Sequence, residues 1–323
     1  MWRRMLAGAA LLAAPAVAHQ LPPGSSVPPA AVEPAPDPAP GPEADPLAIT
    51  EADLRMTVPV SIAGGAAWPF IIDTGSERTV VSSELARRLN LPRGPMRRVL
   101  TMGGAVAATT ALVPNLRVGP VSIALTEAPV FARRNLGAIG MLGIDALQGH
   151  KVSIDLERQT MALLPSRKRR PPRPARNEIV VVAKSLYGQL IVTDARWRGR
   201  KIAVVIDTGS TLTVGNSRLL QIGRKPPPHL GQVEMIAVNG AVIPAELYRL
   251  DRLEIGEVSF LKVPVAIADV APFHRLGLTD RPALLLGMDA LRLFQQVDID
   301  FANRSILLKL PRASAMGSTR PLR

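Results

Sequence analysis

Short runs of apolar residues, several alternating with polar ones as in half-buried β-strands, fill most of the chain. Residues 56–63 and 68–72 are two such runs on either side of Gly64-Gly65, which predicts a hairpin. Residues 83–89 have helical spacing and begin with serine, which predicts a short amphipathic helix with a serine cap. The pattern therefore predicts a protein made mainly of strands.

The same order of elements occurs twice. Residues 72–80 read Ile-Asp-Thr-Gly-Ser-Glu-Arg-Thr-Val, and residues 206–214 read Ile-Asp-Thr-Gly-Ser-Thr-Leu-Thr-Val, 134 positions later. A Leu-Gly turn follows each copy, at Gly143 and at Gly287. Each Leu-Gly turn is followed by a predicted strand pair, residues 152–156 with 161–164 and residues 297–301 with 306–310. A repeated motif in a repeated order indicates an internal duplication.

Composition divides the rest of the chain. Residues 1–18 have a basic start, a short apolar segment and Ala16-Val17-Ala18, which fits a cleaved secretory signal. The alternative, an uncleaved anchor, would need about 20 apolar residues to span a membrane. We expect a signal peptide (1–18), a Pro/Ala-rich disordered spacer (19–47), an N-terminal lobe (48–165), a basic Pro-rich linker (166–177), a C-terminal lobe (178–312) and a flexible tail (313–323). The mature protein is then expected to be periplasmic or secreted, without a transmembrane segment.

The formal net charge of +13 raises the question of a nucleic-acid partner. Arg3 and Arg4 leave with the signal and six basic residues lie in 167–176, so the remainder carries only +5. No aromatic residues are interleaved with the basic ones, so a solvated linker is favoured over a nucleic-acid arm. We expect no nucleic-acid partner, and contact with an anionic envelope surface stays open as an alternative.

Each repeat carries a carboxylate at the end of an apolar strand, followed by glycine and two hydroxyl side chains. Glycine lets the backbone fold tightly behind the carboxylate. Peptide hydrolysis by two carboxyls needs one ionised group to take a proton from water and one protonated group to polarise the carbonyl. Two lobes facing each other would place Asp73 against Asp207, and such a pair should share one proton over an acid-side pH window. The alternative is that both aspartates only form turns in a duplicated architecture.

These motifs, Asp73-Thr74-Gly75-Ser76 and Asp207-Thr208-Gly209-Ser210 with Gly143 and Gly287 downstream, resemble the retropepsin-like aspartic proteases. The resemblance covers residues from about 50 to 312, with two units fused in one chain as in pepsin-like enzymes. It implies an all-β fold with a few short helices, a bilobal acid-protease fold of two duplicated retropepsin-like β-barrel lobes with the cleft between them.

The resemblance also implies roles for individual residues. Asp73 and Asp207 would be catalytic, Thr74 and Thr208 would interlock beneath them, and the residue after each glycine, Ser76 or Ser210, would bond the outer carboxylate oxygen. The function implied is an exported aspartic endopeptidase that hydrolyses a polypeptide with an activated water, expected as a monomer with an intramolecular pseudo-dimer. An inactive peptide-binding module of the same fold and a protease active only as an intermolecular dimer are the alternatives.

A β-hairpin flap over the cleft is a further implication. The candidate tips are Met102-Gly103-Gly104-Ala105 and Val238-Asn239-Gly240-Ala241, and ordinary hairpin turns are the alternative. Neither tip contains tyrosine and the chain has no cysteine, which favours the smaller retropepsin unit over pepsin. Asp145 and Asp289 each precede Ala-Leu at a predicted helix start, which favours helix capping over catalysis.

Other chemistries find little support in the sequence. Without cysteine there is no thiol nucleophile, and His19, His150, His229 and His274 are scattered without a zinc-binding frame. The chain also has no Gly-x-Ser-x-Gly elbow, phosphate-binding loop or dinucleotide fingerprint. We therefore expect neither a metal nor a cofactor.

Overall fold

The computed structural model describes residues 47–48, 50–52, 55–168 and 177–311. All of them belong to one compact unit, Glu43–Arg323. The predicted signal peptide (1–18) and tail (313–323) lie outside the described residues, as do the predicted spacer (19–47), apart from its last residue, and most of the predicted linker (166–177). No helix among the residues described has the length and apolarity to cross a membrane.

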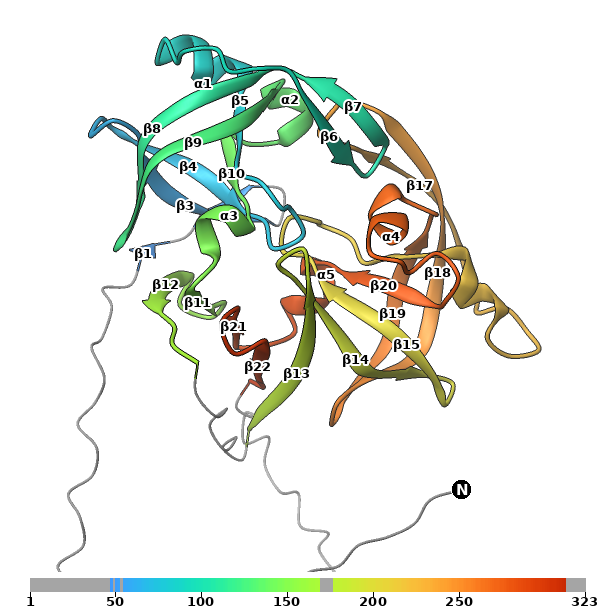
Figure 1. The fold of residues 1–323 in the computed structure, drawn as a ribbon. Helices are drawn as coiled ribbons and strands as arrows, with labels where there is room; N and C mark the ends of the chain where they lie inside the picture. The colour runs from blue at the N-terminus through green and yellow to red at the C-terminus, as the bar shows by residue number, and fades with distance from the viewer. Residues whose placement is uncertain (1–46, 49, 53–54, 169–176, 312–323) are drawn as a thin grey trace, which may run out of the picture. The chain divides into compact units, whose positions relative to one another are not determined.

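The N-terminal lobe is a ring of six strands, drawn in blue to green in Figure 1. The order is β3-β4-β10-β5-β9-β8, and the pairing of Ser61 in β3 with Arg117 in β8 closes the barrel. The strands of this ring are β3 (Arg55–Ser61), β4 (Ala67–Ile72), β5 (Val80–Ser82), β8 (Thr110–Val118), β9 (Val121–Phe131) and β10 (Gly140–Leu142). Around it lie β2 (Thr50–Ala52), the hairpin of β6 (Arg97–Thr101) and β7 (Gly104–Ala108), α1 (Ser83–Arg88), α2 (Arg133–Leu136) and α3 (Ile144–Leu147).

The C-terminal lobe repeats this ring, drawn in yellow to red in Figure 1. Its order is β14-β15-β20-β16-β19-β18, and the pairing of β14 with β18 closes it. The strands are β14 (Gln189–Trp197), β15 (Arg200–Ile206), β16 (Val214–Gly215), β18 (Val242–Ile255), β19 (Val258–Ile267) and β20 (Ala283–Leu286). The other elements are β17 (His229–Ile236), which pairs with β18, the 3-10 helix η1 (Ser217–Gln221), α4 (Ala271–Arg275) and α5 (Met288–Leu291).

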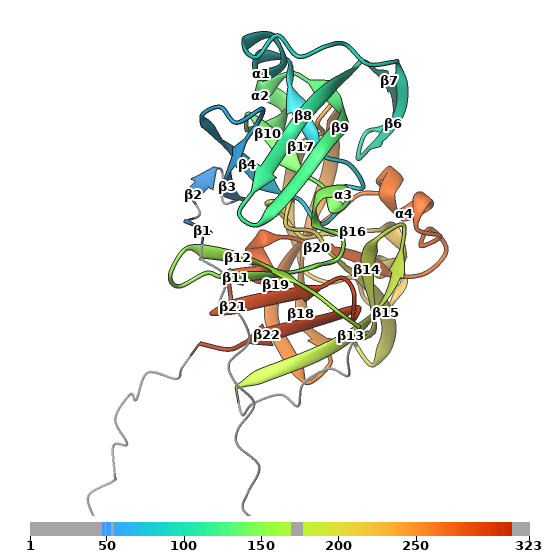
Figure 2. The same cartoon turned by 60° about the vertical axis from the view of Figure 1, so that its left-hand side comes forward.

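A third group of antiparallel strands joins the two lobes, as Figure 2 shows. Its order is β1 (Leu47–Ala48), β12 (Thr160–Pro165), β11 (His150–Asp155), β21 (Gln296–Asp300), β22 (Ser305–Lys309) and β13 (Glu178–Leu186). Strand β11 of the first lobe pairs with β21 of the second, with Val152 opposite Ile299. Asp298 reinforces this seam, because its carboxylate accepts from the Ser153 hydroxyl at 2.6 Å and from the Lys151 ammonium at 2.9 Å.

The local structure follows from the sequence pattern. The predicted hairpin forms with Gly64 at φ +72°, a left-handed conformation that glycine adopts without steric cost. The predicted helix is α1, and Ser82 caps it by accepting from the Leu85 N–H at 3.0 Å. The predicted all-β, duplicated barrel fold is therefore confirmed.

Alternation along the strands sorts side chains between two environments. Ile72 and Ile206 belong to the large aliphatic core that both lobes share. Their neighbours Ile71 and Val205 belong to two smaller clusters on the opposite face. Because successive strand residues point to opposite faces, Asp73 and Asp207 share the face of these smaller clusters.

Candidate active site

The two acidic turns lie at equivalent places in the two barrels. Asp73 follows β4, and its N–H donates to Leu142 O of β10 at 2.9 Å. Asp207 follows β15, and its N–H donates to Leu286 O of β20 at 3.0 Å. In each lobe the turn therefore starts where two parallel strands end, which fixes the direction in which the aspartate leaves the barrel.

The threonines of the two turns interlock across the lobes. The Thr74 N–H donates to Thr208 Oγ1 at 3.1 Å, and the Thr208 N–H donates to Thr74 Oγ1 at 3.2 Å. Each hydroxyl donates in turn to a carbonyl of the opposite lobe, Thr74 to Ile206 O at 2.9 Å and Thr208 to Ile72 O at 2.8 Å. The structure thus brings together the two threonines in the reciprocal arrangement that the resemblance implied. Buried bonds of this kind are expensive to break because each lost partner leaves a buried polar group unsatisfied.

The glycines set how closely the two carboxyls approach. A Cβ placed on Gly75 would lie 2.7 Å from Asp207 Cγ, and one placed on Gly209 would overlap the Asp73 carboxyl. Each carboxyl therefore lies directly on the glycine of the opposite turn, where no larger residue fits. The side chains of Asp73 and Asp207 therefore lie next to each other at the boundary between the lobes, and the two residues are only 8% and 7% exposed.

Backbone N–H groups orient the carboxyls. The Gly75 N–H donates to Asp73 Oδ1 at 2.9 Å, and the N–H groups of Gly209 and Ser210 donate to Asp207 Oδ1 at 3.0 and 3.2 Å. The predicted contact of the serine hydroxyls with the outer carboxylate oxygens is wrong. Ser76 Oγ donates to Arg78 O at 2.8 Å and Ser210 Oγ to Leu212 O at 2.7 Å, because the turn leaves these carbonyls two residues ahead without a strand partner. The serines stabilise the turns and reach the acids through the backbone.

Burial dominates the electrostatics of the pair. Burial, followed by the charge of Asp207, raises the pKa of Asp73 from 3.8 to about 8. Burial also raises the pKa of Asp207, to about 6. In this closed arrangement burial thus favours a pair that keeps one proton between its two carboxyls, because little water reaches either of them. The acid-side window expected from the sequence stays a prediction.

Asp145 and Asp289 lie in the first turns of α3 and α5 but, contrary to the expectation from the sequence, are not their N-cap residues. The N-cap residues are Gly143 and Gly287, whereas Asp289 Oδ1 accepts from the first-turn Ala290 N–H at 2.8 Å. Asp145 Oδ1 accepts from the Thr79 N–H at 2.8 Å and from its hydroxyl at 2.7 Å. These carboxylates belong to the connection between each acidic turn and its Leu-Gly turn.

The threonine at the end of each motif was missed as a functional residue, although both copies contain it. Thr213 repeats the contacts of Thr79, since its N–H and hydroxyl donate to Asp289 at 3.0 and 2.7 Å. Gly287 N–H donates to Thr213 Oγ1 at 3.1 Å, as Gly143 N–H does to Thr79 Oγ1 at 3.2 Å. The repeated Thr-Val at the end of the nine-residue motif was the signal for this network.

Both candidate flaps are hairpin tips, and they meet. Met102 and Gly103 form the tip between β6 and β7, and residues 237–241 form the tip between β17 and β18. A Cβ on Gly103 would lie 2.7 Å from Ala241 Cβ and 3.4 Å from Asn239 Oδ1. A Cβ on Gly240, whose φ is +85°, would lie 2.8 Å from Asn135 Nδ2 of the first lobe.

Each tip packs on the opposite lobe. Met102 contacts the small cluster of the C-terminal lobe that contains Val205, and Val238 contacts the small cluster of the N-terminal lobe that contains Ile71. Each flap tip therefore contacts both lobes. A hollow of about 410 Å³ lies beside the first tip, lined by residues 102–104, 241–244 and 268–271, and neither aspartate lines it.

Two further residues beside the dyad were missed from the sequence. Ile191 pairs with Val205, so the same register places Gln189 opposite Asp207 at the start of β14. The Gln189 side-chain amide donates to Gly75 O of the other lobe. By the same reasoning on the pairing of Thr57 with Ile71, Arg55 lies opposite Asp73. Both residues precede their aspartate by 18 positions, a signal that the duplicated spacing contained.

The described residues contain no group of three or more His, Cys, Asp or Glu side chains that could hold a metal ion. Comparison with known proteins matches the chain to the family described as Aspartyl protease, over residues 58–146 and again over 193–290. Each match contains one acidic turn and one Leu-Gly turn, and together they span more than half of the chain. No curated protein matches the chain. The chain therefore belongs to the aspartyl protease family and consists of two fused retropepsin-like units.

Proposed function

We propose that this protein is an exported aspartic endopeptidase in which Asp73 and Asp207 activate one water molecule. The observation that carries the proposal is the pair of buried, adjacent carboxyls, each lying on the glycine of the opposite turn. A pair that shares one proton can supply both a base and an acid in one site.

The chemistry follows from that proton. The ionised carboxyl takes a proton from the water as its oxygen attacks the peptide carbonyl carbon, while the protonated carboxyl donates its hydrogen to the carbonyl oxygen. In the resulting tetrahedral diol, transfer of a proton to the peptide nitrogen lets the C–N bond break and releases an amine and a carboxylic acid. The pair ends with one proton, as it began, so it is ready for another cycle without a cofactor.

The surroundings of the pair favour a polypeptide substrate. The two flap tips meet each other, and we expect an extended chain to reach the acids only when the tips separate.

The threonine interlock favours an active site formed within one chain. Thr74 and Thr208 satisfy each other's buried N–H groups between lobes of the same polypeptide, so an intermolecular dimer is not needed to bring two acids together. Export remains part of the proposal and rests on residues 1–18 alone. Cell fractionation and N-terminal sequencing of the mature protein would test it, with a start at His19 expected.

The decisive experiment is cleavage of an unfolded protein by purified full-length variants from pH 4 to pH 8. We expect Asp73→Asn and Asp207→Asn each to lower kcat/KM by about a thousandfold or more, because either change removes the base and acid pairing. Asp194→Asn is the matched control, an exposed aspartate on β14, and should retain full activity.

Two outcomes would count against the proposal. Activity retained in both asparagine variants would exclude the dyad. Unchanged peptide binding by these variants, together with no cleavage by the parent protein at any pH, would establish the peptide-binding module instead.

A further inference from the structure

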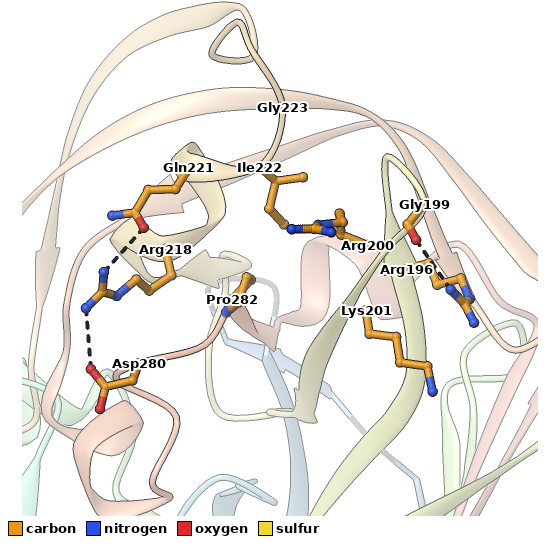
Figure 3. A pocket seen from close by; sticks show the side chains of 10 residues that line it. All are labelled: Arg196, Gly199, Arg200, Lys201, Arg218, Gln221, Ile222, Gly223, Asp280 and Pro282. Atoms are coloured by element: carbon orange, nitrogen blue, oxygen red, sulfur yellow. Dashed lines mark hydrogen bonds and ion pairs between the residues drawn. The ribbon is translucent and has the colours of Figure 1, made fainter.

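A hollow of about 590 Å³ lies on the C-terminal lobe, away from the acidic turns (Figure 3). Its walls are the β14–β15 hairpin, η1 and the loop before β20. Arg200 at its rim begins β15, and Asp207 follows the far end of that strand, so about 23 Å of extended chain separate them. The hollow is therefore distinct from the proposed active site.

Positive charge predominates in this hollow. The charged residues that line it are Arg196, Arg200, Lys201, Arg218 and Asp280. Arg218 is already held, since its guanidinium donates to Asp280 at 3.4 Å, to Gln221 Oε1 at 3.3 Å and to Thr279 O at 3.3 Å. That pairing also uses the single carboxylate among the lining residues.

No carboxylate among the described residues neutralises the charge of the other three cations. Within the part of the chain that the structure describes, Arg196, Arg200 and Lys201 form no ion pair. Arg196 donates only to the Gly199 carbonyl, at 3.3 Å. Because the one lining carboxylate is paired with Arg218, the residues that line the hollow carry an excess of about three positive charges at neutral pH.

The strand pairing places two cations opposite each other, and a bound anion would reduce the repulsion between them. Arg196 and Lys201 are directly opposite each other in the β14–β15 pair, and like charges in that position destabilise a sheet. Glu254 flanks Arg196 on the other side, but its carboxylate is paired with Arg252 at 3.1 Å. The sheet thus holds two cations together without a carboxylate of its own between them.

We infer that this hollow binds a phosphate-class anion with two or three negative charges, either free or as a lipid headgroup. Guanidinium forks match the oxygens of a phosphate, and a lysine ammonium adds a compact positive charge. The volume is within the range of small-ligand sites. The lining residues form one hollow rather than a long groove, which favours a compact anion over an extended acidic peptide. In Figure 3 the Arg200 side chain extends toward Ile222, whereas those of Arg196 and Lys201 extend away from it.

The test is isothermal titration of the full-length protein with inorganic pyrophosphate at constant ionic strength. We expect one additional site in the parent protein that Arg200→Gln/Lys201→Gln weakens by tenfold or more. The matched control is Lys184→Gln/Arg249→Gln, which removes one lysine and one arginine from exposed strand positions of the same lobe, outside the hollow. The control should change the affinity by less than twofold.

A single variant separates binding from folding. Arg196→Gln removes the like-charge pair, so without pyrophosphate its Tm should equal or exceed that of the parent protein, while the rise in Tm on adding pyrophosphate should shrink. Vesicles with and without phosphatidylglycerol distinguish the source of the phosphate. Binding to anionic vesicles that pyrophosphate displaces identifies a lipid headgroup, whereas pyrophosphate binding without vesicle binding identifies a free anion.

Three results would overturn the inference. The first is equal pyrophosphate affinity in the parent protein and the Arg200/Lys201 variant. The second is an equal loss in the Lys184/Arg249 control, which would mean that only overall charge matters. The third is binding of a polyglutamate peptide at this hollow with no binding of pyrophosphate.

Discussion

The two lobes are alike at the acidic turns and different on the strands beside them. In both lobes the aspartate accepts from the glycine N–H two residues on, and the threonine between them reaches the opposite lobe. On the neighbouring strand, however, Arg55 stands opposite Asp73 where Gln189 stands opposite Asp207. The duplication is kept at the turns, where both lobes supply the same atoms to one site, and it has diverged on the neighbouring strands.

The flaps show the same contrast. The β6–β7 hairpin is a two-stranded sheet of its own, whereas β17 pairs with the 14-residue strand β18 within the large sheet. The first flap is held to its own lobe by Arg97 of β6, whose guanidinium donates to Glu127 of β9 at 2.7 and 3.1 Å, and to the other lobe at Met102, whose carbonyl accepts from the Ala271 N–H at 3.3 Å. The second flap is instead part of the large sheet of its own lobe.

The largest expected effect is a loss of stability at the two Leu-Gly turns, and its size in each lobe tests whether the turns are equivalent. Gly143→Ala and Gly287→Ala should each destabilise the fold by about 3 kcal/mol or more, because the new Cβ would overlap the backbone of Arg78 or of Leu212. Urea unfolding measures the loss. Gly64→Ala is the control, since its Cβ would meet no atom within 4 Å and only its φ of +72° is strained, at a cost of about 1 kcal/mol. A small loss at one Leu-Gly turn alone would show that the lobes do not depend on it equally.

The second prediction compares how Asp73 and Asp207 affect the pH dependence of the free energy of unfolding. The folded pKa of Asp73 lies above its ordinary value of 3.8, so the folded state binds the proton more tightly and loses stability as pH rises from about 4 to about 8. Asp73→Asn removes this loss, and its advantage in the free energy of unfolding should grow with pH to a few kcal/mol. Asp207→Asn should gain less, because the pKa of Asp207 rises only to about 6.

Urea unfolding at pH 4, 6 and 8.5 measures both differences. Asp194→Asn, a substitution at an exposed position, is the control variant measured alongside them. An advantage of Asp73→Asn that is constant across this range would contradict the assignment of a raised pKa to burial.

The smallest effect concerns the strand positions where the lobes differ. The charge of Arg55 lowers the pKa of both Asp73 and Asp207, so Arg55→Gln should move the acidic limb of the kcat/KM profile upward by about half a pH unit. Gln189→Arg adds a cation at the equivalent position and should move that limb downward. Profiles that shift in the same direction for both variants would show that charge at these positions does not set the protonation of the pair.

Local patterns carried most of the fold prediction, because strand and turn signals act over few residues. The Gly64-Gly65 hairpin, the helix at residues 83–89 and the repeated turn at Asp207 were all readable from the sequence. Ser76, Asp145 and Asp289 were misassigned, because their hydrogen-bond partners depend on which backbone groups the folded turn leaves without a partner. Gln189 was missed because its partner, Gly75, is 114 residues away in the other lobe.

The sequence by itself determined that the chain is duplicated, that each half presents one aspartate at the end of an apolar strand, and that glycine must follow closely. A repeated motif, the spacing of apolar residues and the position of a glycine are features of short segments, so they can be recognised without knowledge of the fold. Only the tertiary structure decided that each carboxyl lies on the other lobe's glycine, that the flap tips meet, and that Arg196 stands opposite Lys201. Those relations depend on distances between segments far apart in the chain, and packing alone sets such distances.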